Sequence, residues 1–194
     1  AQPDVIDRLT AAYQKEKDPS YKGSFAIALG LLNAQAIGPE LHDDFLQSKD
    51  DDFRGYAAVA LGFLKYMDSA DALRSKIRDK TTTPTFRLQT ATGLGLMGDE
   101  QAISVLIDTL EGAQTLGVSS AVAKSLGLIG DRNAIAPLNN LALDSNRTDL
   151  TRAFAAVALG IVGEKTDLPF NAIISEDNNY RARVPAIDEV LDIL

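Results

Sequence analysis

The sequence of 194 residues contains no cysteine, no tryptophan and a single histidine, His42. Without cysteine there is no disulfide, thiolate metal site or cysteine nucleophile. One histidine allows at most one member of a Ser-His-Asp triad or of a histidine-rich metal site. Aromatic residues make up only 6% of the chain, so stacking platforms for bases or flat chromophores are poorly supplied. We therefore expect no catalytic residue, no cofactor and no metal ion.

Long apolar runs and an excess of basic residues are also missing. The longest weakly polar stretch, "FAIALGLLNAQAIG", is shorter than the roughly 18–20 residues that a membrane span needs. Lys and Arg total 19 against 27 Asp and Glu, a net charge of −8, whereas proteins that bind nucleic acid usually present a basic stripe. The composition predicts a soluble protein that spans no membrane and binds no nucleic acid. It identifies no compartment, although the cytoplasm is favoured.

Because the chain begins with Ala1 and has no basic-then-apolar leader, we expect a processed protein or one part of a longer polypeptide.

The sequence repeats itself with a short period. Residues 54–64 read "RGYAAVALGFL" and residues 152–162 read "RAFAAVALGIV", 98 positions later. The glycine of this segment, here called the marker glycine, recurs in steps of 32, 33, 32 and 33 residues, at Gly30, Gly62, Gly95, Gly127 and Gly160. A fixed period of this length is typical of a solenoid built from supersecondary units.

Each unit reads as a pair of helices. In the first helix, apolar residues at i, i+3, i+4 and i+7, such as Ala57, Ala60, Leu61 and Leu64, predict one buried stripe. Aligned on the marker glycine, the second helix repeats two apolar positions one turn apart, which predicts a second buried stripe. These positions hold Leu41, Leu73, Leu106 and Leu138, followed by Phe45, Ile77, Leu110 and Ala142.

Three of the first helices end in Gly-Asp or Gly-Glu: Gly98-Asp99, Gly130-Asp131 and Gly163-Glu164. This pair invites a catalytic or metal-binding interpretation. A structural interpretation is favoured, because glycine adopts the left-handed conformation that closes a helix and aspartate caps the next one. Pro84, in "TTTPTFR", suits the first turn of a helix.

The repeat predicts an all-α chain folded as a single domain over residues 1–194, with about five helix pairs and a half-unit at each end. In the fifth pair Pro169 predicts a short or distorted second helix, and "VPAIDEVLDIL" reads as a last helix. The expected units are 1–18 (half), 19–51, 52–83, 84–115, 116–148, 149–177 and 178–194 (half).

The pattern "R-x-x-A-A-x-A-L-G-x-x-G-D" on helix pairs of about 32 residues resembles the short HEAT-like repeat, and more narrowly the subgroup first described in phycobilisome (bilin) lyases. The resemblance covers roughly residues 19–194 and is best at 53–67, 86–99 and 151–164. It implies a right-handed α-α superhelix, an armadillo-type solenoid, with first helices on the convex side and second helices on the concave side. Tetratricopeptide and ankyrin units fit less well because their motif residues are absent.

A charged residue is periodic as well. Eight residues before each marker glycine stand Lys22, Arg54, Arg87, Ser119 and Arg152. A cation at a helix start opposes the helix dipole, so another interaction must favour it. We expect a ladder of ion pairs between repeats, with acids that end the preceding unit, such as Asp50, Asp51, Asp52, Asp79 and Asp144.

Two functions remain open for such a chain. The first is a non-enzymatic scaffold that binds a protein partner, of a polar or basic kind, on the concave face. A combined charge change at Arg74, Arg78 and Asp108 is expected to weaken such binding and barely alter stability. The candidate partner-binding residues on the second helices are His42, Asp43, Asp71, Arg74, Arg78, Asp108, Asn139 and Asn140.

The second is a bilin-lyase-like protein that handles a linear tetrapyrrole, which rests on fold analogy alone. A HEAT-like DNA glycosylase fits worst because it needs a basic, aromatic-lined groove. The acidic stretch "HDDFLQSKDDDF" (42–53) matches no calcium loop, and we interpret it as a solvated face.

Overall fold

Helices are the only regular secondary structure in the part that the computed structural model describes, residues 3–79 and 81–164. The predicted all-α class is thus confirmed, and the expected short helix after Pro169 and the last helix at 184–194 lie outside the described residues. The α-helices are α1 (Pro3–Lys15), α2 (Pro19–Leu31), α3 (Gly38–Gln47), α4 (Asp51–Phe63), α5 (Ala70–Ile77), α6 (Pro84–Met97), α7 (Ile103–Glu111), α8 (Leu116–Ile129), α9 (Ile135–Leu143) and α10 (Asp149–Glu164). Four short 3₁₀ helices precede the second helices: η1 (Gln35–Ile37), η2 (Met67–Ser69), η3 (Glu100–Ala102) and η4 (Arg132–Ala134).

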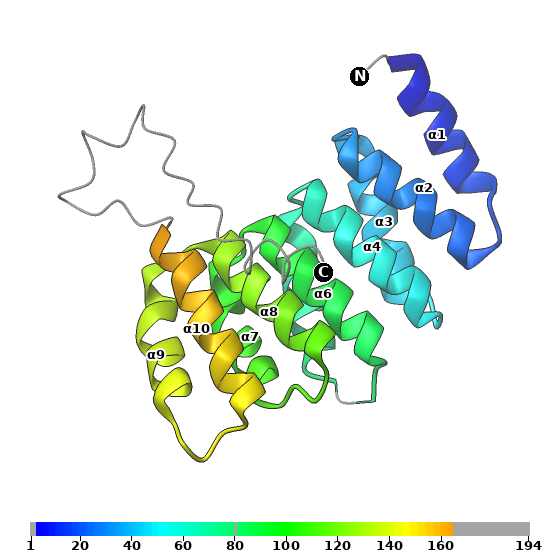
Figure 1. Ribbon diagram of the computed structural model, residues 1–194. Helices are drawn as coiled ribbons and strands as arrows, with labels where there is room; N and C mark the ends of the chain where they lie inside the picture. Colours follow the sequence, from blue (N-terminus) through cyan, green and yellow to red (C-terminus); the bar gives the residue numbers. More distant parts are fainter. Residues whose placement is uncertain (1–2, 80, 165–194) are drawn as a thin grey trace, which may run out of the picture.

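The helices form two layers (Figure 1). The first helices α2, α4, α6, α8 and α10 lie side by side in one layer, and the second helices α3, α5, α7 and α9 lie behind them. Helix α1 packs on α2 as α3 packs on α4, which is the place of the second helix of a preceding unit. This is the stacked, all-α solenoid that the repeat predicts.

Local sequence sets where the helices begin and end. The side chains of Asp18, Asp50, Thr83 and Thr115 accept hydrogen bonds from the first free amides of α2, α4, α6 and α8, as N-cap residues do. Pro84 occupies the first turn of α6, as expected.

The two Gly-Asp pairs have the expected structural role, whereas Gly163-Glu164 lies inside α10 and closes no helix among the described residues. Gly98 and Gly130 close α6 and α8 with left-handed φ angles of 75° and 70°. Asp99 and Asp131 then cap η3 and η4 by accepting from the amides of Gln101 and Asn133.

The core lies between the two layers. The aligned leucines Leu41, Leu73, Leu106 and Leu138 are fully buried, as predicted. One turn further along, the side chains at the second aligned position change from aromatic Phe45 to aliphatic Ile77 and Leu110, all buried. This change of size along the stack shapes a cavity described below.

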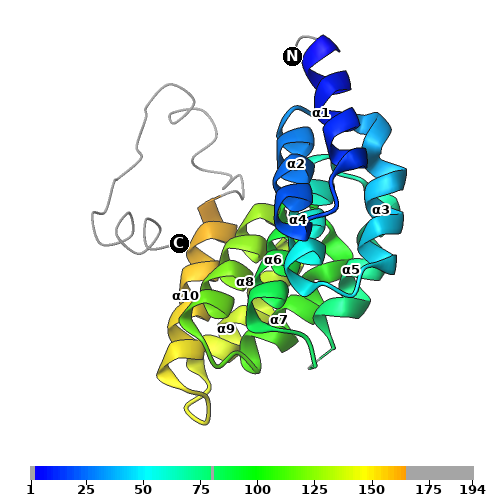
Figure 2. The same cartoon turned by 90° about the vertical axis from the view of Figure 1, so that its right-hand side faces the viewer.

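The two layers are spaced differently. Small residues let the first helices approach closely: a Cβ added at Gly62 would lie 2.6 Å from the carbonyl oxygen of Gly93, and one at Gly30 would lie 3.0 Å from that of Ala60. The second helices of neighbouring units, in contrast, barely touch. A stack curves toward its tighter layer, so the first helices line the inner, concave side, and Figure 2 shows the second helices along the outer side of the curve. The expectation that second helices line the concave side is wrong. Glycines and alanines bring the first helices closer together than the second helices, and the stack curves accordingly.

Candidate partner-binding surfaces

The residues predicted to bind a partner lie on the outer layer. His42 and Asp43 are on α3, Asp71 and Arg74 on α5, Arg78 is its C-cap, Asp108 is on α7, and Asn139 and Asn140 are on α9. Asp43, Asp71, Arg78, Asp108, Asn139 and Asn140 are exposed, whereas His42 and Arg74 are partly buried. The eight residues therefore form no single concave row.

His42 joins two units. Its Nδ1 lies 2.8 Å from the hydroxyl of Ser69, a fully buried residue of η2 in the next unit. Its ring also packs against Tyr66, with ring centroids 6.3 Å apart. Partial burial raises the pKa of Tyr66, and the charge of Asp68 raises it further. These contacts give His42 a structural place between α3 and η2.

Arg74 also joins two units. Its guanidinium forms ion pairs with Asp99, the N-cap of η3 in the next unit, and with Asp71 on its own helix. Burial alone would lower the pKa of Arg74, but the hydrogen bonds to Asp99 and Asp71 raise it above the ordinary value. Because Asp99 is buried, we now expect a change at Arg74 to destabilise the fold, in place of the expectation that it barely alters stability.

The expected ladder of ion pairs between repeats forms only in part: of the acids named for it, Asp51 pairs with a periodic cation, but the structure places Asp51 on the same helix as that cation. Arg54 pairs with Asp51 on its own helix at 3.0 Å, and Arg152 with Asp149 on its own helix at 3.4 Å. Lys22 pairs at 2.7 Å with Asp44, on the second helix of its own unit. For Arg54 and Arg152 the paired acid stands three residues earlier on the same helix, where side chains one turn apart meet.

Cation–π contacts, rather than ion pairs, link two of these cations, Arg54 and Lys22, to the neighbouring units. The guanidinium of Arg54 lies between Phe45 of the preceding unit and Phe86 of the following one, 5.5 and 4.6 Å from the ring centroids. Lys22 lies in the same way between Tyr13 and Phe53, at 4.7 and 5.5 Å. Each cation thus holds three successive units together through cation–π contacts.

Tyr13 contacts the Lys22 ammonium through its ring and Asp44 through its hydroxyl. Its buried hydroxyl donates a hydrogen bond to the carboxylate of Asp44, the acid that pairs with Lys22. Burial, and then this hydrogen bond, raise the pKa of Tyr13 well above its ordinary value. The phenol therefore stays neutral and links α1 to α3.

The first helices present a different surface on the concave side, here called the inner face. It consists of the residues three before and one after each marker glycine, which alternate with fully buried alanines such as Ala58 and Ala91. All ten are at least partly exposed, and Lys124 is the one charged residue among them. The inner face comprises Ile27, Leu31, Val59, Phe63, Thr92, Leu96, Lys124, Leu128, Val157 and Ile161.

Sequence reasoning missed the inner face, although the signal was present. The position three before the marker glycine varies, as from Val59 in "AAVALGF" to Thr92 in "TATGLGL", next to an alanine, a leucine and the glycine that do not change. Variation inside a constant framework is what a binding surface on a repeat scaffold shows. The mixed polar row expected on the concave side is replaced by a largely apolar one.

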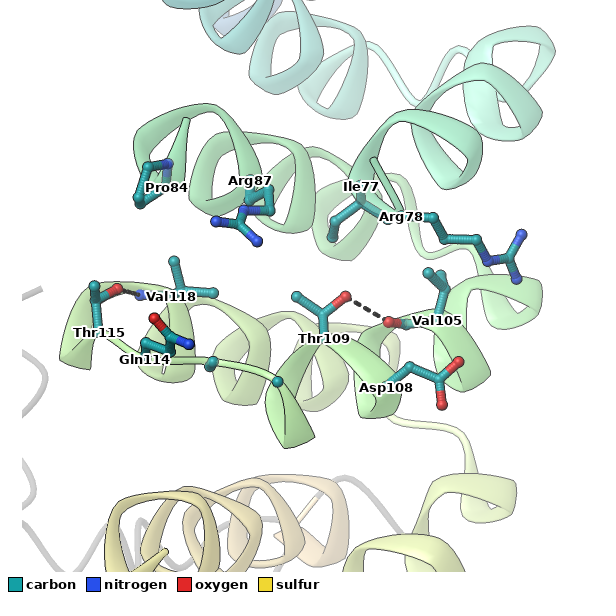
Figure 3. A pocket seen from close by; sticks show the side chains of 12 residues that line it. Ile77, Arg78, Pro84, Arg87, Val105, Asp108, Thr109, Gln114, Thr115 and Val118 are labelled. Atoms are coloured by element: carbon teal, nitrogen blue, oxygen red, sulfur yellow. Dashed lines mark hydrogen bonds between the residues drawn. The ribbon is translucent and has the colours of Figure 1, made fainter. Parts of the chain in front are cut away.

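A cavity of about 550 Å³ opens at the edge of the stack, where α5, α6, α7 and α8 meet (Figure 3). Two of the predicted residues, Arg78 and Asp108, line it together with Arg87, a periodic cation.

Within the described ranges no three His, Asp or Glu side chains are placed to hold a metal ion. None of the helices described is long and apolar enough to cross a bilayer.

Comparison with known proteins agrees with this architecture. The sequence profile of HEAT repeats matches residues 38–121 and 76–160, which together cover more than half of the chain. The chain therefore belongs to the HEAT-repeat family, as the resemblance implied. It is similar to the bilin biosynthesis protein PecE of Nostoc sp. (strain PCC 7120), with 39% identity over 72 residues. That match covers 37% of this chain and 28% of PecE, so the chain matches little more than a quarter of its relative.

Proposed function

We propose that this chain is a non-enzymatic scaffold that binds a partner protein on its inner face. The observation that carries the proposal is the continuous row of partly exposed, mostly apolar side chains along five adjacent first helices. Curvature toward this layer lets one partner segment contact several units at once, which is how solenoids bind. With a single charge in the row, we expect the partner to present the apolar side of an amphipathic helix.

Site-specific crosslinking tests this proposal. A photoreactive benzoyl-phenylalanine is introduced at Phe63 or Leu96 of the inner face, and, as matched controls, at Asp43 or Asn139 of the outer layer. In extracts of the source cell we expect one discrete adduct from both inner positions and none from the outer ones. Adducts confined to the outer positions, or no adduct from any position, would contradict the proposal.

The similarity to PecE supports a second candidate function, the handling of a bilin. PecE is described as a bilin biosynthesis protein, and 39% of the 72 matched residues are identical. A visible absorbance titration with a linear tetrapyrrole distinguishes the two functions. A scaffold of the proposed kind leaves the bilin spectrum unchanged, whereas a saturable shift in the absorption maximum would favour chromophore handling.

A further inference from the structure

One of the periodic cations, Arg87, lies in surroundings unlike those of the others. In the two preceding units, Arg54 and Lys22 each have a carboxylate partner and lie between two aromatic rings. The side chain of Arg87 has no ion pair or hydrogen bond within the described part of the chain, and its buried Nε lacks any partner. The Nε of Arg54 is also without a hydrogen bond, but the rest of that guanidinium is paired and stacked.

Four substitutions at aligned positions explain the difference. The rings that hold Arg54, Phe45 and Phe86, are replaced around Arg87 by Ile77 and Val118. Asp51, the acid three residues before Arg54, is replaced by Pro84. Asp44, the acid that pairs with Lys22, is replaced in the unit of Arg87 by Thr109.

All four replacements line the cavity of about 550 Å³, and so does Arg87 itself. Figure 3 shows the guanidinium of Arg87 facing the cavity from α6, opposite Val118 and Gln114. The space that two rings and a carboxylate fill in the preceding units is therefore open here. Arg87 lies next to this space at the same repeat position as Arg54.

We infer that this cavity, the Arg87 pocket, binds a peptide segment in which a carboxylate is adjacent to an aromatic side chain. The carboxylate pairs with the guanidinium, as Asp51 does with Arg54, and the ring occupies the space between Ile77 and Val118. A partly buried arginine whose Nε has no partner favours an anionic ligand, since charge-assisted hydrogen bonds are stronger than neutral ones. The aliphatic walls and the cation favour a ring over an alkyl chain.

The other charges of the pocket agree with an anionic ligand. Arg78 and Asp108 lie at the end of the pocket away from Arg87 in Figure 3. Among the residues that line the pocket, the two arginines outnumber the one acid. The choice of a peptide as the source of the carboxylate rests on the proposed scaffold function, whereas the chemistry of the ligand rests on the pocket alone. The pocket is also separate from the inner face.

Nuclear magnetic resonance with a dipeptide tests the inference. The ¹⁵N-labelled chain is titrated with N-acetyl-Glu-Phe-amide, while the Nε–H signal of Arg87 and the amide signal of Val118 are followed. We expect both signals to shift and saturate. N-acetyl-Gln-Phe-amide, which lacks the charge, and N-acetyl-Glu-Ala-amide, which lacks the ring, should bind at least about ten-fold more weakly, the loss that follows from removing about 1.4 kcal/mol of interaction.

A variant that fills the pocket from within gives the matched control. Pro84→Asp restores the acid found at Asp51, so it should shift the Arg87 Nε–H signal without peptide and weaken binding of the Glu-Phe probe at least ten-fold. Pro19→Asp makes the same change at the aligned position of α2 and should leave binding unaltered. Arg87→Gln should abolish binding while the spectrum stays dispersed.

Three results would overturn the inference: no shift of Arg87 at saturating probe, equal binding of the Gln-Phe probe, or unchanged binding to Pro84→Asp. The crosslinking from Phe63 and Leu96 does not depend on Pro84. A failed titration therefore leaves the inner-face proposal standing, and failed crosslinking leaves the chemistry of the Arg87 pocket standing.

Discussion

Single side chains connect one helix pair to the next in this chain, and two of these contacts involve a buried residue, Asp99 or Ser69. Arg74 leaves α5 to reach Asp99 at the start of η3, and His42 leaves α3 to reach Ser69 in η2. Both bonds cross from one unit to the next. Removing one member of a buried ion pair leaves an unpaired charge behind, which costs far more than the loss of an exposed pair.

The Arg74–Asp99 pair allows a direct comparison of a buried and an exposed acid on the same guanidinium. The side chain of Asp99 is 3% exposed and that of Asp71 is 93% exposed. We expect Asp99→Ala to lower the free energy of unfolding by about 3–5 kcal/mol, and Asp71→Ala to change it by less than about 1 kcal/mol. Urea denaturation of both variants measures the difference, and equal losses would show that burial does not decide the strength of this contact.

Asp79 provides a pH-dependent contact in the loop before α6. Hydrogen bonds from the hydroxyl and the amide of Thr81 lower the pKa of Asp79 below its ordinary value. Because the pKa is lower in the folded than in the unfolded chain, this contribution to stability is full above the ordinary carboxyl range and is lost as the pH falls below it.

Thr81→Val removes the hydroxyl donor, so we expect the pKa of Asp79 to rise toward its ordinary value. Carboxyl ¹³C titration by nuclear magnetic resonance measures it. Asp144, whose pKa is lowered chiefly by the amide of Asn146, serves as the internal control and should not move. A pKa of Asp79 unaltered by Thr81→Val would mean that the amide alone holds the carboxylate.

Among the helices, close packing within one layer sets the shape of the stack. The first helices touch backbone to backbone at Gly62 and Gly93, and through Gly95 and Ser125 one unit further on. A methyl group at such a point meets main-chain atoms that have no rotamer by which to move aside. The marker glycine therefore sets the distance between neighbouring first helices. The cost of replacing it depends on which atoms of the neighbouring helix lie next to it.

Two marker glycines form a matched test of this role. Gly62→Ala would place Cβ 2.6 Å from the carbonyl oxygen of Gly93, so we expect it to destabilise the chain by about 1–3 kcal/mol, the usual cost of overpacking. Gly160→Ala meets nothing within 4 Å among the described residues and should stabilise α10 by about 0.5–1 kcal/mol, the difference in helix propensity. Thermal unfolding monitored by circular dichroism measures both, and a loss of stability at Gly160 would contradict the spacing argument.

Across the whole molecule, each unit contacts mainly its neighbours, so damage should spread locally. The fully buried Leu106 on α7 provides the test. Leu106→Ala should cost about 2–5 kcal/mol, as in other cores. Hydrogen exchange should lose protection mainly in α5 to α9 and little in α1 and α2. Leu143→Ala, at a side chain 72% exposed, is the control and should change neither quantity. Uniform loss of protection along the chain would show that the stack unfolds as one unit.

The sequence by itself determined the repeat, its helix pairs and their buried stripes. Leu73, Leu106 and Leu138 could be assigned to the core because the 32–33-residue period aligns them, and burial of one aligned position implies burial of the others. Gly98 and Asp99 could be assigned to a helix end because the left-handed φ and the cap depend on a few adjacent residues. Such features follow from short-range rules that act within one helix or turn.

The tertiary structure decided which layer is concave, and with it the candidate site. That outcome depends on the distance between helices about 32 residues apart, set by contacts such as Gly62 on Gly93 that no single helix reveals. In the same way, the aligned cations Arg54 and Arg87 look alike in sequence. One is enclosed by rings and the other faces a cavity, because side chains from three different units meet around each guanidinium.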